Sequence, residues 1–371
     1  MLLAYYVYFW TLVITVAFGW VTSHNRQREQ VKLKRADILI PVLLISLLMG
    51  FRYQVGTDWE QYQSHYVNVL HFGISWQEIA DSTMEPLYWI LNVCIASFDL
   101  PYQLFFAVIM FLHLILLYKS FDRYIFLLPW GLFFYFTTVF TASLNIHRQT
   151  LSFCIFLYAL RFVIDRNFLK YFLWISVAAL VHYSSLILFP VYFLSVRGMR
   201  FLDNKYVMLF LYGLFFFLFE YFLNFITDIL SLYIVNAKYL QNLSVLGNKE
   251  MEVSSGLGIL LTYVVDIVLI LYSKRLSKVF GRYRFNVLFR IFFVGICLAN
   301  VFGIDVFLSR VPFALESLRF LMLAYLVYYL FGIKRSVFGY GLGGVIVLLY
   351  LMMFLVGIYN GNSGCSPFHF A

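Results

Sequence analysis

The sequence has little charge and little proline, and no segment that looks like a linker. Only 12% of its 371 residues are charged, whereas about a quarter of the residues in a soluble domain are charged. Its seven prolines and 21 glycines form no linker or low-complexity tract, and no internal repeat is visible. These absences argue against a soluble protein and against a division into modules. We therefore expect a single transmembrane domain over residues 1–371.

Cysteine is also scarce, and its spacing excludes further classes of protein. Cys94, Cys154, Cys297 and Cys365 fit neither a disulfide framework nor a metal site, so we interpret them as apolar packing residues. The sequence also lacks a P-loop and the spaced carboxylates of metal-dependent nucleotide-sugar transferases. We expect no metal and no cofactor.

Long apolar segments, by contrast, recur along the whole chain. Hydrophobic residues make up 63% of it, and runs of roughly 17 to 25 apolar residues can cross a bilayer as helices. The first run, MLLAYYVYFWTLVITVAFGW, has no basic start and no cleavage site, so we expect a retained helix. The predicted fold class is all-α, a polytopic integral membrane protein.

The net charge of +9 is distributed as in a membrane protein, which argues against nucleic acid as a partner. Six short stretches contain 21 of the 27 lysines and arginines, and the positive-inside rule places all six in the cytoplasm. These stretches are residues 26–35, 119–123, 161–170, 197–205, 274–290 and 334–335. The orientation of every helix follows from this assignment.

Twelve membrane spans are compatible with that orientation, and both termini then lie outside. The spans are expected near residues 3–21, 37–51, 102–118, 125–141, 146–164, 168–181, 183–196, 206–226, 256–273, 287–303, 310–331 and 337–358. Two long outer loops result, at residues 52–84 and 227–255. The apolar segment at 86–98 is too short for a thirteenth span, and a span there would invert the later loops. We therefore predict a re-entrant or interfacial helix on the outer side.

Four arginines lie outside the basic stretches, at or within expected helices. Arg52, Arg148 and Arg310 are all expected at the outer side, where the orientation rule disfavours positive charge. Snorkelling or pairing with an acid would explain them structurally. An anion site would explain them functionally, because guanidinium groups bind phosphate oxygens in a bidentate manner. Arg319 is expected inside a helix, where Glu316 can pair with it.

Three residues are candidates for acid–base chemistry, and each has a structural alternative. Asp58 follows Gly56-Thr57, whose turn could direct its carboxylate back to Arg52, but it could also cap the next helix. Glu85 precedes a proline and could likewise cap a helix. His182 lies between two short expected helices and could face a cavity or be a packing residue. His147 is a weaker candidate, because adjacent helix residues diverge by about 100° and should not share a site with Arg148.

Four motifs in order resemble those of the EpsG/Wzy-like family of polysaccharide polymerases. They are FRYQVGTDWEQY, MEPLYWILN, NIHRQTLSFCIFLYALRF and LVHYSSLILFPVYF. The matching positions are Arg52, Gly56-Thr57-Asp58, Tyr62, Glu85-Pro86, Arg148-Gln149, His182 and Ser184. The similarity is good over residues 37–200 and general beyond, with Arg310 on a late helix. Family members often end in Pro-Tyr, whereas this chain has Pro367 followed by Phe368.

The resemblance implies a lipid-linked oligosaccharide polymerase of a multi-helix type similar to other lipid-sugar-dependent glycosyltransferases. Such an enzyme transfers a growing glycan from undecaprenyl pyrophosphate to the non-reducing end of a lipid-linked repeat unit. It lies in the bacterial plasma (inner) membrane, and its active site faces the periplasm or cell exterior. The implied partners are the lipid-linked donor and acceptor, membrane lipids and a chain-length regulator.

The residues can be given roles in this chemistry. We expect Arg148 and Arg310 to bind pyrophosphate, with Arg52 supporting them or holding Asp58. For the general base, the order of expectation is Asp58, then His182, then Glu85. A carboxylate near the anomeric carbon would also stabilise its developing positive charge. Weaker candidates for binding the glycan are Tyr53, Tyr62 and Gln149.

Two other functions remain open at this point. An O-antigen ligase-type glycan transferase would use the same donor and similar arginines, but would transfer finished polymer to a lipid core. A polytopic lipid-sugar transporter would need charges deep in the membrane, often with inverted repeats. The deep charges expected here are Asp266 and the pair Glu316 and Arg319.

Overall fold

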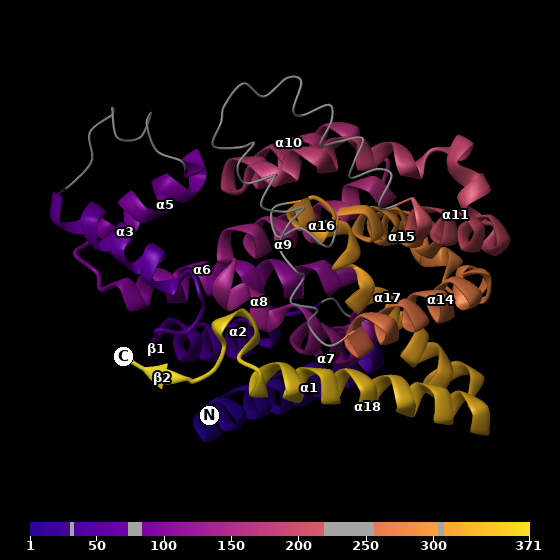
Figure 1. Cartoon of the computed structure of the whole chain (residues 1–371), viewed down its shortest axis with the longest axis horizontal. Coiled ribbons are helices and arrows are strands. Elements are labelled where there is room, and N and C mark those ends of the chain that lie inside the picture. Colours follow the sequence, from indigo (N-terminus) through magenta and orange to yellow (C-terminus); the bar gives the residue numbers. More distant parts are fainter. Residues whose placement is uncertain (30–32, 73–83, 219–255, 303–307) are drawn as a thin grey trace. The chain divides into compact units, whose positions relative to one another are not determined.

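The computed structural model of the chain describes residues 1–29, 33–72, 84–218, 256–302 and 308–371 (Figure 1). These residues form fifteen α-helices, together with shorter 3₁₀ and π segments. The β-structure in this part of the chain is one antiparallel pair of two-residue strands. The all-α prediction is confirmed.

Among the described residues, six helical segments are long and apolar enough to cross a membrane. They are Leu2–Arg26, Tyr102–Arg123, Gly256–Val279, Phe285–Phe302, Phe313–Lys334 and Val337–Tyr359. Six shorter apolar helices accompany them, and one of these, Pro86–Ala96, is the expected short helix. The chain is therefore a multi-pass membrane protein. The total of twelve spans, the orientation and the membrane position of the short helix stay predictions.

The contacts divide the chain into two compact units, which we describe separately. The first unit contains residues 1–195 and 320–371. Its elements are α1 (Leu2–Glu29), α2 (Arg35–Gly50), β1 (Arg52–Tyr53), α3 (Trp59–Phe72), α5 (Pro86–Ala96), α6 (Tyr102–Ser120), η1 (Phe121–Arg123), η2 (Ile125–Leu127), α7 (Leu128–Thr138), α8 (Phe140–Asn145), α9 (His147–Ile164), α10 (Phe168–Val181), η3 (Tyr183–Ser195), α17 (Arg319–Tyr328, whose first residue belongs to the second unit), η7 (Tyr329–Lys334), α18 (Val337–Tyr359), η8 (Asn362–Gly364) and β2 (His369–Phe370).

The second unit contains residues 196–319. Its elements are η4 (Arg197–Asp203), α11 (Lys205–Phe217), α14 (Gly256–Val279), η5 (Gly281–Tyr283), α15 (Phe285–Phe302), η6 (Leu308–Arg310) and α16 (Phe313–Glu316). Parts of the two expected outer loops, residues 73–83 and 227–255, lie outside the described residues. The single transmembrane domain stays a prediction.

α9 is the central helix of the first unit. Thirteen of its 18 residues are buried, and it packs against α6, α8, α10 and η3. α6 packs in turn against α2, where the two backbones approach so closely that a Cβ on Gly50 would lie 2.8 Å from the Ala107 Cα. The polar start of α9 is therefore largely surrounded by protein, with His147 buried and the Arg148 side chain 20% exposed.

One aromatic cluster joins the helices that surround the start of α9. It combines buried side chains of α3, α5, α6, α9 and α10, including Trp59, Tyr66, Tyr88, Phe105 and Phe106. The ring of Tyr66 stacks on that of Phe105 at a centroid distance of 4.9 Å. Aromatic pairs of this kind each add about 0.5–1.5 kcal/mol beyond the burial of their area. The cluster therefore gives the neighbouring polar groups a rigid support.

Three expected spans are not continuous α-helices. Residues 125–141 break at Val139 into α7 and α8, next to Thr137 and Thr138, whose hydroxyls donate back to carbonyls of the preceding turn. Such back-bonding bends helices. Residues 183–195 form a 3₁₀ segment around Pro190, which cannot donate to an α-helical ladder. Residues 310–331 are divided among η6, α16, α17 and the π segment η7.

Candidate functional site

Glu85, Arg148 and His182 meet in the first unit, although the sequence separates them widely. Arg148 Nη1 donates to Glu85 Oε2 at 2.6 Å, and His182 Nδ1 lies 2.6 Å from Glu85 Oε1. The Tyr183 backbone N–H also donates to Oε1, at 3.3 Å. The Glu85 side chain is 4% exposed, that of His182 12% and that of Arg148 20%. One buried carboxylate thus joins three segments of the chain.

Local sequence places each member of this cluster at the end of a helix. Pro86 fixes the first residue of α5, and Glu85 before it is extended. The Glu85 side chain makes no capping hydrogen bond to α5, so the capping alternative is excluded and the carboxylate is left for Arg148 and His182. Arg148 lies in the first turn of α9, and the extended conformation of His182 ends α10.

The electrostatics of the cluster favour an ionised Glu85. Burial alone would raise the pKa of this carboxyl, but the His182 hydrogen bond and the Arg148 charge outweigh burial and lower it. An ionised carboxylate only accepts hydrogen bonds, so His182 Nδ1 is the donor. In the neutral imidazole the lone pair then lies on Nε2, a buried atom without a hydrogen-bond partner in the described structure. Buried polar atoms of this kind are uncommon and need an explanation.

Two tyrosines surround the guanidinium of Arg148. Its Cζ atom lies 5.6 Å from the ring centroids of both Tyr62 and Tyr88. Tyr62 also stacks on His147 at 3.7 Å, and the Tyr88 hydroxyl lies 2.5 Å from His147 Nε2. His147 and Arg148, although adjacent on α9, thus contact the same two tyrosines, and the expectation that they do not face one site stays a prediction. The two rings, from α3 and α5, extend around the start of α9 and contact both side chains.

His65 belongs to this environment, and the sequence analysis missed it. It follows Tyr62 by three residues on α3, so the two share a helix face. Its ring meets that of Trp89 edge-on at 4.8 Å, and its Nε2 is buried without a hydrogen-bond partner among the described residues. Burial, and then the charge of Arg148, lower the pKa of His65. The spacing from Tyr62 was the available signal.

Arg52 does not hold Asp58, which corrects that expectation. Its guanidinium donates to the carbonyls of Met49, Val55 and Leu144 at 2.8, 3.3 and 3.2 Å, and lies 4.6 Å from the Phe106 ring centroid. The side chain is among the largest fully buried ones. Burial lowers the pKa of Arg52 to about 10, which still leaves it charged at neutral pH. These contacts hold the turn between α2 and α3, and the expected role of Arg52 toward pyrophosphate stays a prediction.

Asp58 lies at the end of that turn, just before α3. Its backbone N–H donates to Asn145 Oδ1 at 2.9 Å, and the Thr57 hydroxyl donates to the same oxygen at 2.8 Å. The charges of Arg148, Asp58 and Glu85 all act on the Tyr62 hydroxyl, although burial is the main reason that its pKa is raised. Asp58 therefore lies near the cluster without an ion pair to it.

The remaining predicted site residues occupy different surroundings. Tyr53 is exposed in β1, with its ring edge-on to Trp59 at 5.1 Å. Gln149 is buried on α9 beside Arg148. Arg310 is exposed at the end of η6 in the second unit. Their roles toward a glycan or pyrophosphate stay predictions.

The deep charges of the second unit form their own cluster. Arg319 Nε and Nη2 donate to the two oxygens of Asp266 at 2.8 and 3.0 Å, and Tyr212 donates to Asp266 at 3.2 Å. The expected pair of Arg319 with Glu316 is present but longer, at 3.9 Å. The bidentate geometry identifies Asp266 as the principal partner.

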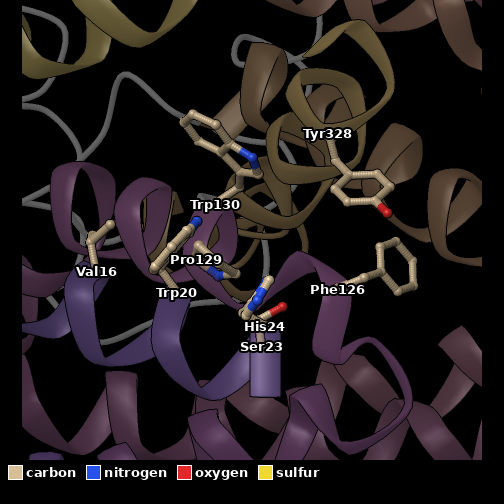
Figure 2. Close-up of a pocket in the computed structure, with 8 residues that line it drawn as sticks. All are labelled: Val16, Trp20, Ser23, His24, Phe126, Pro129, Trp130 and Tyr328. Carbon is tan, nitrogen blue, oxygen red and sulfur yellow. The ribbon is translucent and has the colours of Figure 1, made fainter. Parts of the chain in front are cut away.

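A hollow of about 300 Å³ lies elsewhere in the first unit and contains none of the predicted site residues (Figure 2). Residues of α1, the start of α7 and Tyr328 line it, and Trp20 and Trp130 give it a mainly aromatic wall. Within the described residues, no group of three or more histidine, cysteine or acidic side chains is arranged to hold a metal ion.

The fold and the site define a multi-pass membrane protein with a buried carboxylate held between an arginine and a histidine. The chain belongs to the EpsG family, whose model matches residues 37–370. This family is associated with exopolysaccharide biosynthesis. The match confirms the resemblance and extends it beyond residue 200. Neither the search of curated proteins nor the search of solved structures gives a match to the chain.

Proposed function

We propose that the chain is a lipid-linked oligosaccharide polymerase. It transfers a growing glycan from undecaprenyl pyrophosphate to the non-reducing end of a lipid-linked repeat unit, without a metal. The reaction takes place on the outer face of the bacterial plasma membrane, and membrane lipids and a chain-length regulator are its further partners. The observation that carries this proposal is the buried contact of Glu85 with both His182 and Arg148.

His182 is the general base of the proposed reaction. Glu85 holds Nδ1–H, so Nε2 can accept the proton of the acceptor hydroxyl as that oxygen attacks the anomeric carbon. The bond between the anomeric carbon and the pyrophosphate oxygen breaks, and pyrophosphate leaves with the electron pair. This geometry favours His182 over Asp58 as the base and makes Glu85 a positioning residue.

Arg148 contacts the leaving group in this scheme. Glu85 and the rings of Tyr62 and Tyr88 orient its guanidinium, and one-fifth of the side chain remains exposed. A held guanidinium can stabilise the charge that develops on pyrophosphate. Tyr62 is buried against His147 and Arg148, which supports a positioning role over sugar stacking. Asp58 is the carboxylate available to stabilise positive charge on the sugar.

The test uses purified protein in detergent with a synthetic undecaprenyl-pyrophosphate repeat unit, EDTA and no nucleotide sugar. A ladder of oligomers on a gel is the expected product. Arg148→Ala should abolish the ladder while the protein stays folded. Arg123→Ala is the matched control, because Arg123 forms a similar charge pair with Asp165 at an exposed position. Unreacted substrate with wild-type protein would contradict the polymerase function.

Arg310 is tested in the same assay. We expect Arg310→Ala to remove the ladder as Arg148→Ala does, since both are proposed to bind pyrophosphate. Long products from the Arg310 variant would remove this residue from the site and leave the Glu85 cluster as the basis of the proposal.

A further inference from the structure

The turn between α2 and α3 is held by the C-terminal segment of the chain. The Gly56 N–H donates to the Gly364 carbonyl at 2.9 Å, and the Ala371 N–H donates to the Phe51 carbonyl at 2.8 Å. Between these bonds, β1 and β2 pair in an antiparallel register that sets Tyr53 opposite His369. Figure 1 shows β2 beside β1. We call residues 362–371 the C-terminal strap.

The strap is itself anchored to α1. The Tyr8 hydroxyl donates to the Cys365 carbonyl at 2.9 Å, and the Phe368 ring meets the Tyr8 ring edge-on at 5.5 Å. Phe368 is 1% exposed and Cys365 is fully buried. Burying a phenylalanine side chain removes its apolar surface from solvent and stabilises the segment that carries it. The Phe368 side chain therefore fixes the strap, whereas that of Phe370 is 46% exposed.

The contact between strap and turn is close enough to require glycine. Gly364 has a φ of +66°, and a Cβ there would lie 2.7 Å from the Thr57 nitrogen and 2.9 Å from the Gly56 carbonyl carbon. A side chain at position 364 would push the strap and the turn apart, in addition to the strain of a positive φ. Thr57 is the residue directly before Asp58.

The turn between α2 and α3 also contacts the junction of α8 and α9. Arg52 donates to the Leu144 carbonyl, and the Asn145 side chain accepts from Thr57 and from the Asp58 backbone. Asn145 ends α8, and Arg148 lies in the first turn of α9. The turn is therefore packed between the strap and the helix start that carries Arg148.

We propose that the C-terminal strap positions Asp58 and Tyr62 relative to Arg148, and that Gly364 and Phe368 are positioning residues for the reaction. The expected effect on turnover rests on the proposed polymerase function. The contact between the strap and the turn does not depend on that function. Releasing the strap would loosen residues 51–62 and displace Asp58 and Tyr62, while the core around α9 and α10 stays folded.

The test compares Phe368→Ala with Phe370→Ala, its exposed neighbour, in the full-length protein. Hydrogen exchange of residues 51–62 and maleimide labelling of Cys365 report release of the strap, and both are read by mass spectrometry. Labelling of buried Cys154 reports general unfolding. In the lipid-linked substrate assay, Phe368→Ala should lower kcat at least tenfold with KM within about twofold. Phe368→Leu, which keeps an apolar side chain, should restore most of the rate.

Each outcome decides the inference. Faster exchange and labelling with a lowered kcat support it, provided that Phe370→Ala behaves as wild type. Unchanged exchange in residues 51–62, or faster exchange with an unchanged kcat, overturns it. If Phe368→Ala exposes Cys154, then Gly364→Ala is judged by the same criteria, and unfolding of both variants assigns the strap a folding role only. If wild-type protein gives no ladder, the polymerase proposal fails, and exchange still shows whether the strap holds the turn.

Discussion

His182 Nδ1 lies 2.6 Å from Oε1 of Glu85, a residue 97 positions earlier in the chain. The other oxygen of the same carboxylate accepts from Arg148 at 2.6 Å. Because an ionised carboxylate can only accept, both contacts fix the hydrogens on the partner side chains. Glu85 thereby selects one tautomer of His182 and one orientation of the Arg148 guanidinium.

Replacing His182 should remove turnover without unfolding the protein. In the proposed reaction His182→Ala lacks the group that accepts the hydroxyl proton, and positioned general bases contribute about 10²- to 10⁴-fold. Initial rates on the lipid-linked repeat unit measure the loss. His71→Ala is the matched control, because His71 is an exposed histidine in the last turn of α3. A rate within a few fold of wild type in His182→Ala would exclude the base assignment.

Glu85→Gln should lower both stability and activity. The amide keeps the shape of the side chain but loses its charge, so the buried ion pair with Arg148 becomes a hydrogen bond from a charged donor to a neutral acceptor. Bonds to charged groups contribute about 1.5–3 kcal/mol, and we expect a loss in that range. Thermal unfolding in detergent measures it. An unchanged unfolding midpoint would show that the ion pair adds nothing to the fold.

The stability of the protein should fall as the pH drops below about 4.5, the ordinary pKa of a glutamate. The folded-state pKa of Glu85 is lowered, so its contribution is fully present above 4.5 and is lost as the pH falls through the folded-state value. Thermal unfolding midpoints recorded at several pH values from 7 to 3.5 measure how stability depends on pH. This dependence should be shallower in Glu85→Gln than in the wild type. Asp165→Asn is the control, since Arg123 lowers the Asp165 pKa in the same direction at a more exposed site. Equal acid sensitivity in Glu85→Gln and wild type would contradict the assignment.

Arg52→Met should reduce the amount of folded protein. Methionine leaves the Met49, Val55 and Leu144 carbonyls without their donor, and each unsatisfied buried group costs about 1–3 kcal/mol. Abundance in the membrane and the unfolding midpoint measure the effect, and Arg52→Lys should recover part of it. Normal abundance of Arg52→Met together with loss of polymer would restore Arg52 as an anion-binding residue.

Apolar run lengths predicted the helices well, because a bilayer span needs a fixed number of apolar residues. The same reasoning could not detect the break at Val139, which depends on Thr137 and Thr138 hydroxyls turning back onto the helix. It likewise placed Pro190 in a regular span, where the backbone forms 3₁₀ turns. Length and hydropathy determine whether a segment is helical, while single side chains determine where it breaks.

The residues of the candidate site stand out in the sequence, but the contacts between them do not. Arg148, Glu85 and His182 stand out because polar residues at the ends of apolar helices are costly without a role. Which acid pairs with which base depends on tertiary packing, which the sequence does not show. The sequence therefore suggested a pair of Arg52 with Asp58, whereas the Arg52 guanidinium donates to three backbone carbonyls. His65 escaped notice because its signal in the sequence, a spacing of three residues from Tyr62 on α3, does not by itself indicate a site.

The bidentate pair of Asp266 and Arg319 should be coupled in stability. Their side chains are 2% and 16% exposed, and removing one partner of a buried pair costs about 3–5 kcal/mol.

In a double-mutant cycle, Asp266→Asn combined with Arg319→Met should therefore destabilise the protein by much less than the sum of the single changes. The exposed pair of Arg123 and Asp165 is the comparison, and surface pairs contribute about 0–1 kcal/mol. The free energies of unfolding in detergent complete the cycle. If the destabilising effects of the two single changes were additive, Asp266 and Arg319 would not stabilise the fold as a pair. Unchanged stability in Asp266→Asn, together with a wild-type activity that depends on a coupling ion, would instead favour a transporter, because deep charges in transporters bind ions.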